Sequence, residues 1–291
     1  MAHGPKETTD AVLIGRRGRL REEVAEHLGP ATAVVSQPDD LDHLAELLLA
    51  ERGNRPLTGT AAVLITQPFL PGLGTSIRYR SRSRTLTAKY ASVATTVRDL
   101  GADLLVVCSS AFLYADDHGL PLRATSRTEA HGETVAAYAA ERAAQHFSHL
   151  GGRSVVLRLG WVFGEADPIT DRVTSAARKG WQLIQGNPGA WVAALSTADA
   201  AAAIAAAMAA PPGTYNIADD RPVTQGSVNA VLQQATGTLL HPLDDPGWGE
   251  DSTLFGASRR LETRSFTQLT GWRPSPSDLL GHLCKRIWGS P

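Results

Sequence analysis

Short apolar runs alternate with segments of helical spacing along the first 160 residues of this chain. The runs lie at residues 11–14, 33–35, 62–65, 104–108 and 154–159. Between the first two, Leu20, Val24 and Leu28 recur at helical spacing among arginines and glutamates. Apolar strands that alternate with amphipathic helices predict a parallel sheet covered by helices on both faces. The alternation therefore predicts an α/β fold with a Rossmann-like doubly wound parallel sheet.

The pattern changes after Gly160, and all six tryptophans lie in the part that follows. A helix at 197–210 and a strand at 214–218 are expected to return to the sheet. The predicted organisation is a Rossmann-like dinucleotide-binding domain at 1–160 and, mainly in 161–291, a smaller C-terminal substrate-binding lobe. Because α/β proteins bind ligands at the carboxyl edge of the sheet, the lobe is expected to pack there.

Composition excludes several classes of function. The net charge of −1 gives no overall field that would favour nucleic acid or a membrane as a partner. No apolar run approaches the ~20 residues that span a bilayer, and the first ten residues lack the apolar core of a signal peptide. Cys108 and Cys284 are the only cysteines, too few for a disulfide framework. His146 and His149 lack a third metal ligand at a familiar spacing, so no metal is expected. A cytoplasmic protein of a bacterium, which binds a small-molecule substrate, is the expectation.

Four polar residues lie at the end of the fourth strand and after it, at informative spacing. Ser110 ends that strand, and Tyr114 comes four residues later. Tyr138 and Arg142 are four residues apart on the helix expected at 133–150, so their side chains share one face. A tyrosine hydroxyl beside a cation and a serine hydroxyl is an arrangement suited to proton transfer at a carbonyl or alcohol oxygen.

These residues resemble the catalytic set of the extended short-chain dehydrogenase/reductase family, which includes nucleotide-sugar epimerases, dehydratases and reductases. The resemblance implies Tyr138 as the proton donor, Ser110 as the group that orients the carbonyl, and Arg142 in the place of the family's lysine. Arginine keeps the positive charge, but its planar guanidinium does not reproduce a lysine's contacts with a ribose.

Later segments are also similar to the family's motifs, in the same order. They are 156–164, 195–201, 213–218 and 271–274, so the likeness runs from about Ala11 to Pro274. Within them, Phe163 stands where the family usually has a tyrosine. The resemblance implies that Tyr114, Phe69 and Phe163 border the substrate, and that the helices at 85–100 and 133–150 pair in a homodimer.

The glycine turn after the first strand departs from the family pattern Gly-x-x-Gly-x-x-Gly. Gly15 and Gly18 match it, but Arg21 occupies the third position. Arg21 either obstructs a nucleotide or turns outward to meet a phosphate, and Arg16 and Arg17 lie within reach of the same place. No acidic residue ends the second strand, so NADP(H) is favoured over NAD(H) if a cofactor binds at all. The alternative is a turn that binds no cofactor.

The segment after the third strand departs as well. Phe69 stands between Pro68 and Pro71, where the family usually has small residues beside the cofactor. The four arginines within 77–84 alternate with other residues, which predicts an edge strand or a loop.

Three functions remain open. The first is an NADP(H)-dependent reductase or epimerase that acts on a carbonyl of a nucleotide sugar or a small bacterial metabolite. The second is a cofactor-independent isomerase, dehydratase or cyclase of natural-product biosynthesis. The third is a non-catalytic ligand-binding protein.

Overall fold

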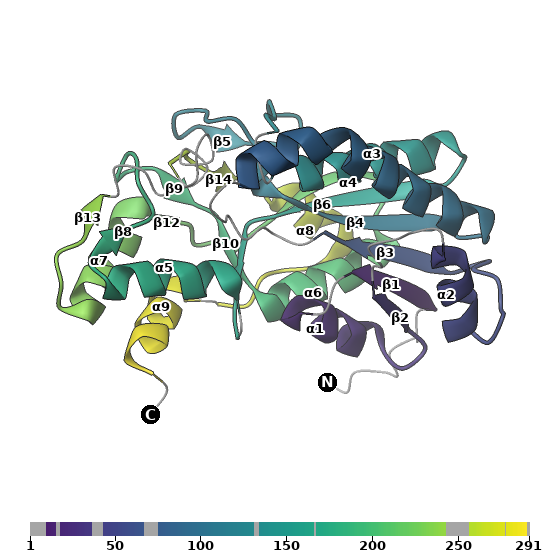
Figure 1. Ribbon diagram of the computed structural model, residues 1–291, viewed down its shortest axis with the longest axis horizontal. Coiled ribbons are helices and arrows are strands. Elements are labelled where there is room, and N and C mark those ends of the chain that lie inside the picture. The colour runs from purple at the N-terminus through teal and green to yellow at the C-terminus, as the bar shows by residue number, and fades with distance from the viewer. Residues whose placement is uncertain are drawn as a thin grey trace.

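A six-stranded parallel sheet forms the centre of the computed structural model (Figure 1). The structure describes residues 10–15, 18–36, 43–66, 75–130, 134–165, 167–242, 256–276 and 278–289, with only the backbone for 75–83. The strands are β1 (Ala11–Gly15), β2 (Ala33–Ser36), β3 (Ala61–Ile65), β4 (Leu104–Ser110), β6 (Arg153–Leu159) and β11 (Gly213–Ile217). Their order in the sheet is β11-β6-β4-β3-β1-β2. The predicted α/β fold class is confirmed.

The central strands are apolar because both faces of the sheet are covered. Every residue of β1, β3 and β4 is buried. Their register aligns Leu13 with Val63, and Val63 with Val106, so branched side chains pack in continuous rows. Burial on both faces explains why these strands read as unbroken apolar runs rather than as alternating ones.

Helices divide into two layers (Figure 1). One core contains buried side chains of α1 (Arg19–Leu28), α6 (Thr197–Ala206) and α8 (Arg264–Thr270) against one face of the sheet. The opposite core contains those of α2 (Leu44–Glu51), α3 (Thr75–Asp99) and α4 (Thr134–His149). None of the described helices combines the length and apolar composition that crossing a bilayer requires.

The arginine-rich segment differs from its prediction. Residues 77–84 were expected in an edge strand or a loop, and they form part of the long helix α3. Alternating arginines suggested a period of two, but the segment 75–99 contains no proline or glycine to end a helix. The expectation of a strand there is therefore wrong.

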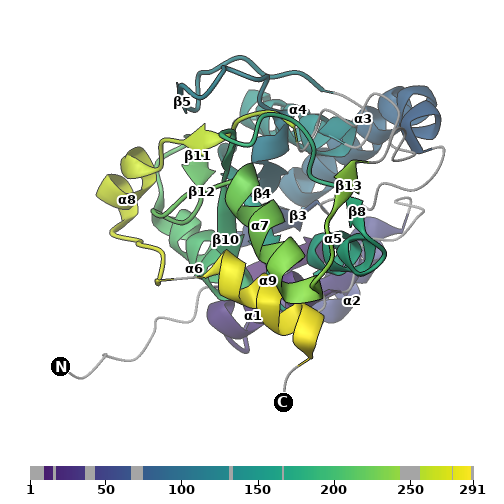
Figure 2. The ribbon, with the colours of Figure 1, turned by 90° about the vertical axis from the view of Figure 1, so that its left-hand side faces the viewer.

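A smaller lobe lies at one end of the sheet, with α5 (Pro168–Arg178), α7 (Gln225–Thr236) and α9 (Leu279–Trp288) grouped together (Figure 2). Short strand pairs join it: β7 (Trp161–Phe163) with β10 (Ala194–Ser196), β8 (Trp181–Gln182) with β13 (His241–Pro242), and β9 (Trp191–Val192) with β12 (Val223–Thr224). A further pair, β5 (Pro121–Leu122) with β14 (Arg260–Leu261), and the 3₁₀ turns η1 (Ala111–Leu113) and η2 (Ala207–Ala209) complete the elements.

The chain leaves the sheet after β6 and returns to it through α6 and β11. α6 packs against α1, and β11 pairs with β6 along its whole length. Residues far apart in the sequence thus complete one layer and one edge of the same sheet.

Candidate functional site

The strand order places a topological switch point between β1 and β3. From β1 the chain moves outward to β2 and then crosses back to β3, so the connections at the carboxyl ends of β1 and β3 diverge. Ligands of open α/β sheets bind in the crevice at such a point. The residues that end these two strands, Gly15 and Ile65, are aligned in the register and lie at this point.

Gly15 lies in close contact with the neighbouring strand. A Cβ atom there would lie 3.1 Å from the Ile65 Cβ and 3.2 Å from the Ile65 carbonyl oxygen. Beyond Ile65, the Thr66 hydroxyl donates to the carbonyl of Cys108, which ties the end of β3 to β4. Close strand packing therefore accounts for a glycine at position 15 without any bound nucleotide.

Arg21 turns inward. It lies on the buried face of α1 with Val24 and Leu28, at 9% exposure. Its Nη1 donates to the Gly15 carbonyl oxygen across 3.1 Å. The sequence left two orientations open, inward against a nucleotide or outward toward a phosphate, and the side chain points inward. Gly18 is the exposed N-cap residue of α1, while Arg16 and Arg17 lie outside the described residues.

Ser110 and Tyr114 lie in the core at the end of β4. The Ser110 Oγ accepts a hydrogen bond from the Phe112 backbone N–H across 3.2 Å and so caps η1. The Tyr114 hydroxyl donates to Asn216 Oδ1 across 2.5 Å, and the ring lies 4.8 Å below the Arg158 guanidinium. Burial raises the pKa of Tyr114. Tyr114, which is 2% exposed, ties the end of η1 to β11.

Tyr138 and Arg142 lie on the outer face of α4. Tyr138 is 43% exposed, and among the described residues its hydroxyl has no hydrogen-bond partner. Arg142 is exposed and donates to Gln145 Oε1 across 2.8 Å. The two side chains share an exposed face of α4, as their spacing requires.

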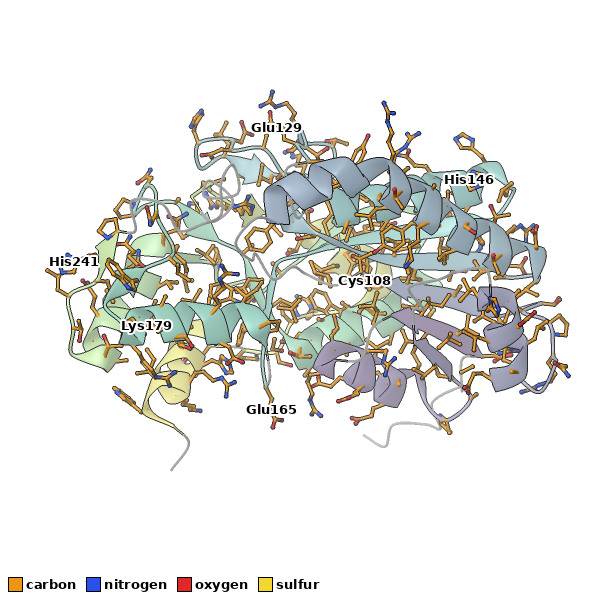
Figure 3. All side chains as sticks on the ribbon, in the orientation of Figure 1. Cys108, Glu129, His146, Glu165, Lys179 and His241 are labelled. Carbon is orange, nitrogen blue, oxygen red and sulfur yellow. The ribbon has the colours of Figure 1, made fainter. Side chains whose placement is uncertain are left out.

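Within the described residues, no hydrogen bond joins Ser110 to Tyr138. Ser109 contacts α4 through Glu141, and side chains alternate along a strand, so Ser110 points to the opposite face of the sheet. In Figure 3 the label Cys108 marks β4 just before Ser109 and Ser110, and the label His146 marks α4 about two turns after Tyr138. The predicted convergence of the Tyr138 phenol and the Ser110 hydroxyl stays a prediction.

A buried ion pair that the sequence reasoning missed occupies the inner side of α4. Glu141 Oε1 accepts from Ser109 Oγ at 2.6 Å and from Arg158 Nε at 2.8 Å, and its Oε2 accepts from Arg158 Nη2 at 2.8 Å. Arg158 also donates to the Ala124 carbonyl. Burial alone would lower the pKa of Arg158, but the hydrogen bonds and charge of Glu141 raise it. An arginine within the apolar run of β6 was the available signal, because a buried charge requires a partner.

Aromatic side chains fill the space between the sheet and the lobe. Phe112, Trp161 and Trp191 border a cavity of about 10 Å³, which accommodates no more than a water molecule. The Trp161 Nε1 donates to Asp167 Oδ2 across 3.1 Å. Arg259 also borders the cavity and donates to the carbonyls of Ala111 and Phe112, and burial lowers its pKa to about 10.

Of the two remaining predicted substrate contacts, only Phe163 lies within the described residues. Phe163 is 5% exposed and packs beside His282, with ring centroids 5.4 Å apart. Phe69 lies outside the described residues.

Solved structures share this architecture, although sequence comparison finds no relatives. No protein-family model matches the chain, and no curated protein matches it. A UDP-glucose 4-epimerase of Thermotoga maritima, solved with UDP-glucose, superposes with a TM-score of 0.72 at 15% identity over 96% of this chain and 97% of that one. A human epimerase family protein solved with NADPH gives 0.72 at 17% identity over 97% and 100%. The dTDP-glucose 4,6-dehydratase DesIV of Streptomyces venezuelae, solved with NAD, gives 0.71 at 16% identity over 96% of each chain. The chain thus has the fold of the epimerases and dehydratases of the extended short-chain dehydrogenase/reductase family, the one that its motifs resemble.

Proposed function

We propose that this chain binds a nucleotide sugar, or a small metabolite of similar chemistry, at the carboxyl edge of its sheet without using a nicotinamide. The observation that carries the proposal is the placement of Tyr138 and Arg142 on the outer face of α4. The Tyr138 side chain is exposed there, and the Ser110 Oγ is bonded to the Phe112 N–H rather than to this phenol.

Arg21, at the third position of the glycine turn, does not fit a dinucleotide. A pyrophosphate needs close approach to backbone N–H groups between the strand end and the helix, which glycines permit. Here the guanidinium of Arg21 is buried in that seam and bonded to the Gly15 carbonyl. No step of chemistry is therefore assigned to NADP(H) or NAD(H).

The ligand class follows from the fold's relatives. The Thermotoga maritima epimerase was solved with UDP-glucose, and DesIV is described as a dTDP-glucose 4,6-dehydratase. Both superpose over nearly the whole chain, lobe included, which supports a ligand of the same class here. A protein that binds the nucleotide sugar but no nicotinamide would bind this ligand without oxidising or reducing it.

The outer face of α4 has a different use under this proposal. The homodimer predicted through the helices now described as α3 and α4 stays a prediction, and Tyr138, Arg142 and His149 lie on the exposed face that such pairing would cover. Their exposure is then a matter of subunit contact rather than of catalysis.

Calorimetric titration tests the proposal. The purified protein is titrated separately with UDP-glucose, dTDP-glucose, NADPH and NADH, each to about 1 mM, a concentration that detects even weak sites. We expect binding of a nucleotide sugar, unchanged in the Tyr138→Phe variant, and none of either nicotinamide. Absence of any nucleotide-sugar binding would reject the proposal.

A second candidate is the NADP(H)-dependent reductase or epimerase. The fold of the human protein solved with NADPH favours it, as does Ser110 at the end of β4. Oxidation of NADPH in the presence of a keto-sugar nucleotide, lost in Tyr138→Phe and retained in Tyr114→Phe, would establish this candidate and displace the first.

A further inference from the structure

Arg21 is the third residue of α1, and its side chain runs under the helix. It shares the buried face with Val24 and Leu28, which pack on the sheet. The guanidinium reaches back to the end of β1, where Nη1 lies 3.1 Å from the Gly15 carbonyl oxygen. The side chain therefore spans the seam between the end of β1 and the start of α1.

That seam is the part of a dinucleotide-binding fold where the helix packs closely on the strand, beside the place of the pyrophosphate. The third glycine of the turn lets the helix pack closely on the strand, while the pyrophosphate rests at the helix N-terminus. An arginine at this position adds a long side chain where glycine has none. Because only 9% of Arg21 is exposed, the side chain is held in the seam by its surroundings.

We propose that Arg21 is the residue that excludes dinucleotides from this protein. The inference deepens the proposed function, on which it rests: it names the side chain that separates nucleotide-sugar binding from nicotinamide binding. The described strands of the switch point, β1 and β3, keep their parallel register, with Gly15 at the end of β1. Removal of one side chain should then restore room for a pyrophosphate.

The opposite role predicts the opposite result. A guanidinium is also a good phosphate ligand, and an Arg21 that bound phosphate would strengthen dinucleotide binding. Removing the side chain would then weaken affinity instead of raising it. The sign of the change separates the two roles.

The experiment compares four variants with the wild type. Arg21→Gly and Arg21→Ala open the seam, whereas Arg21→Met removes the charge and keeps most of the bulk. Arg19→Gly is the matched control: Arg19 lies two residues earlier on the same helix, is exposed, and pairs with Glu23 at 2.9 Å. It therefore carries a similar loss of charge and helix propensity without opening the seam.

Each protein is titrated with ADP-ribose and with NADPH by calorimetry, and its thermal midpoint is recorded with and without ligand. We expect Arg21→Gly or Arg21→Ala to bind both ligands at least about ten-fold more tightly than the wild type, while Arg21→Met and Arg19→Gly stay at the wild-type level. Weaker or unchanged binding in both opened variants overturns the proposal. A parallel titration with UDP-glucose keeps the outcomes apart, because failure of the wild type to bind UDP-glucose rejects the proposed function whatever the Arg21 variants do.

Discussion

Removal of the Glu141 carboxylate should destabilise the protein more than any exposed charge change. Glu141 and Arg158 have side chains that are 13% and 8% exposed, so water cannot replace the lost partner. Glu141→Gln removes the negative charge and turns one acceptor of an arginine N–H into a donor. Breaking a buried pair by removing one partner costs ~3–5 kcal/mol. Against a total stability of ~5–15 kcal/mol, this is a large fraction.

Urea unfolding followed by tryptophan fluorescence measures the cost. Glu262→Gln is the matched control, because Glu262 pairs with Arg123 at 2.9 Å while the two side chains are 42% and 74% exposed. An exposed pair of this kind contributes ~0–1 kcal/mol. If Glu141→Gln costs no more than Glu262→Gln, the account of this ion pair is wrong.

A double variant separates the lost attraction between Glu141 and Arg158 from the cost of leaving the Arg158 charge buried and unpaired. Glu141→Leu alone leaves the Arg158 guanidinium buried without its carboxylate. Glu141→Leu combined with Arg158→Met removes both charges, and apolar replacements of buried pairs are often neutral or stabilising. The double variant should therefore unfold at higher urea than Glu141→Leu. A double variant that is less stable than the single one would contradict this reasoning.

Three further changes have defined outcomes. Tyr114→Phe leaves Asn216 Oδ1 without its donor in a buried site and should lower the free energy of unfolding by ~1–3 kcal/mol in urea, whereas Tyr138→Phe should change it little. Gly15→Ala pushes a methyl group against Ile65 and should lower the thermal midpoint, at a cost of ~1–3 kcal/mol, and a midpoint equal to the wild type would contradict the packing argument. Burial lowers the pKa of His282 below 6.5, so the unfolded chain takes up the proton first as the pH falls. The stability that neutral His282 contributes is therefore present above pH 6.5 and is lost below it. His282→Gln should flatten that part of a plot of thermal midpoint against pH.

Periodicity was sufficient for the sheet and its helices, because apolar strands and amphipathic helices each leave a local signature. It failed at 77–84, where alternating arginines carry no information about the hydrogen bonds of the backbone. The fold class was predicted from the alternation of strands and helices over about 150 residues, so one wrongly assigned segment does not alter it.

The predicted catalytic set shows what spacing leaves undecided. A separation of four residues puts Tyr138 and Arg142 on one side of a helix, but it does not say which side faces the sheet. The small residues Ala140, Ala143 and Ala144 were the better guide, since they mark the packed face of α4. The same reasoning applies to Arg21, which stands three and seven residues before Val24 and Leu28 and so belongs to the buried stripe of α1.

The return of the chain to β11 makes this protein hard to divide. A shortened gene that stops at residue 160 would omit α6, exposing the apolar side of α1, and would leave β6 with a row of unsatisfied backbone groups along one border. Strand borders of that kind recruit other chains, so such a fragment should precipitate or self-associate instead of folding as a free unit. Grafting a different lobe onto this sheet would accordingly require joining the polypeptide at both the exit after β6 and the re-entry before α6.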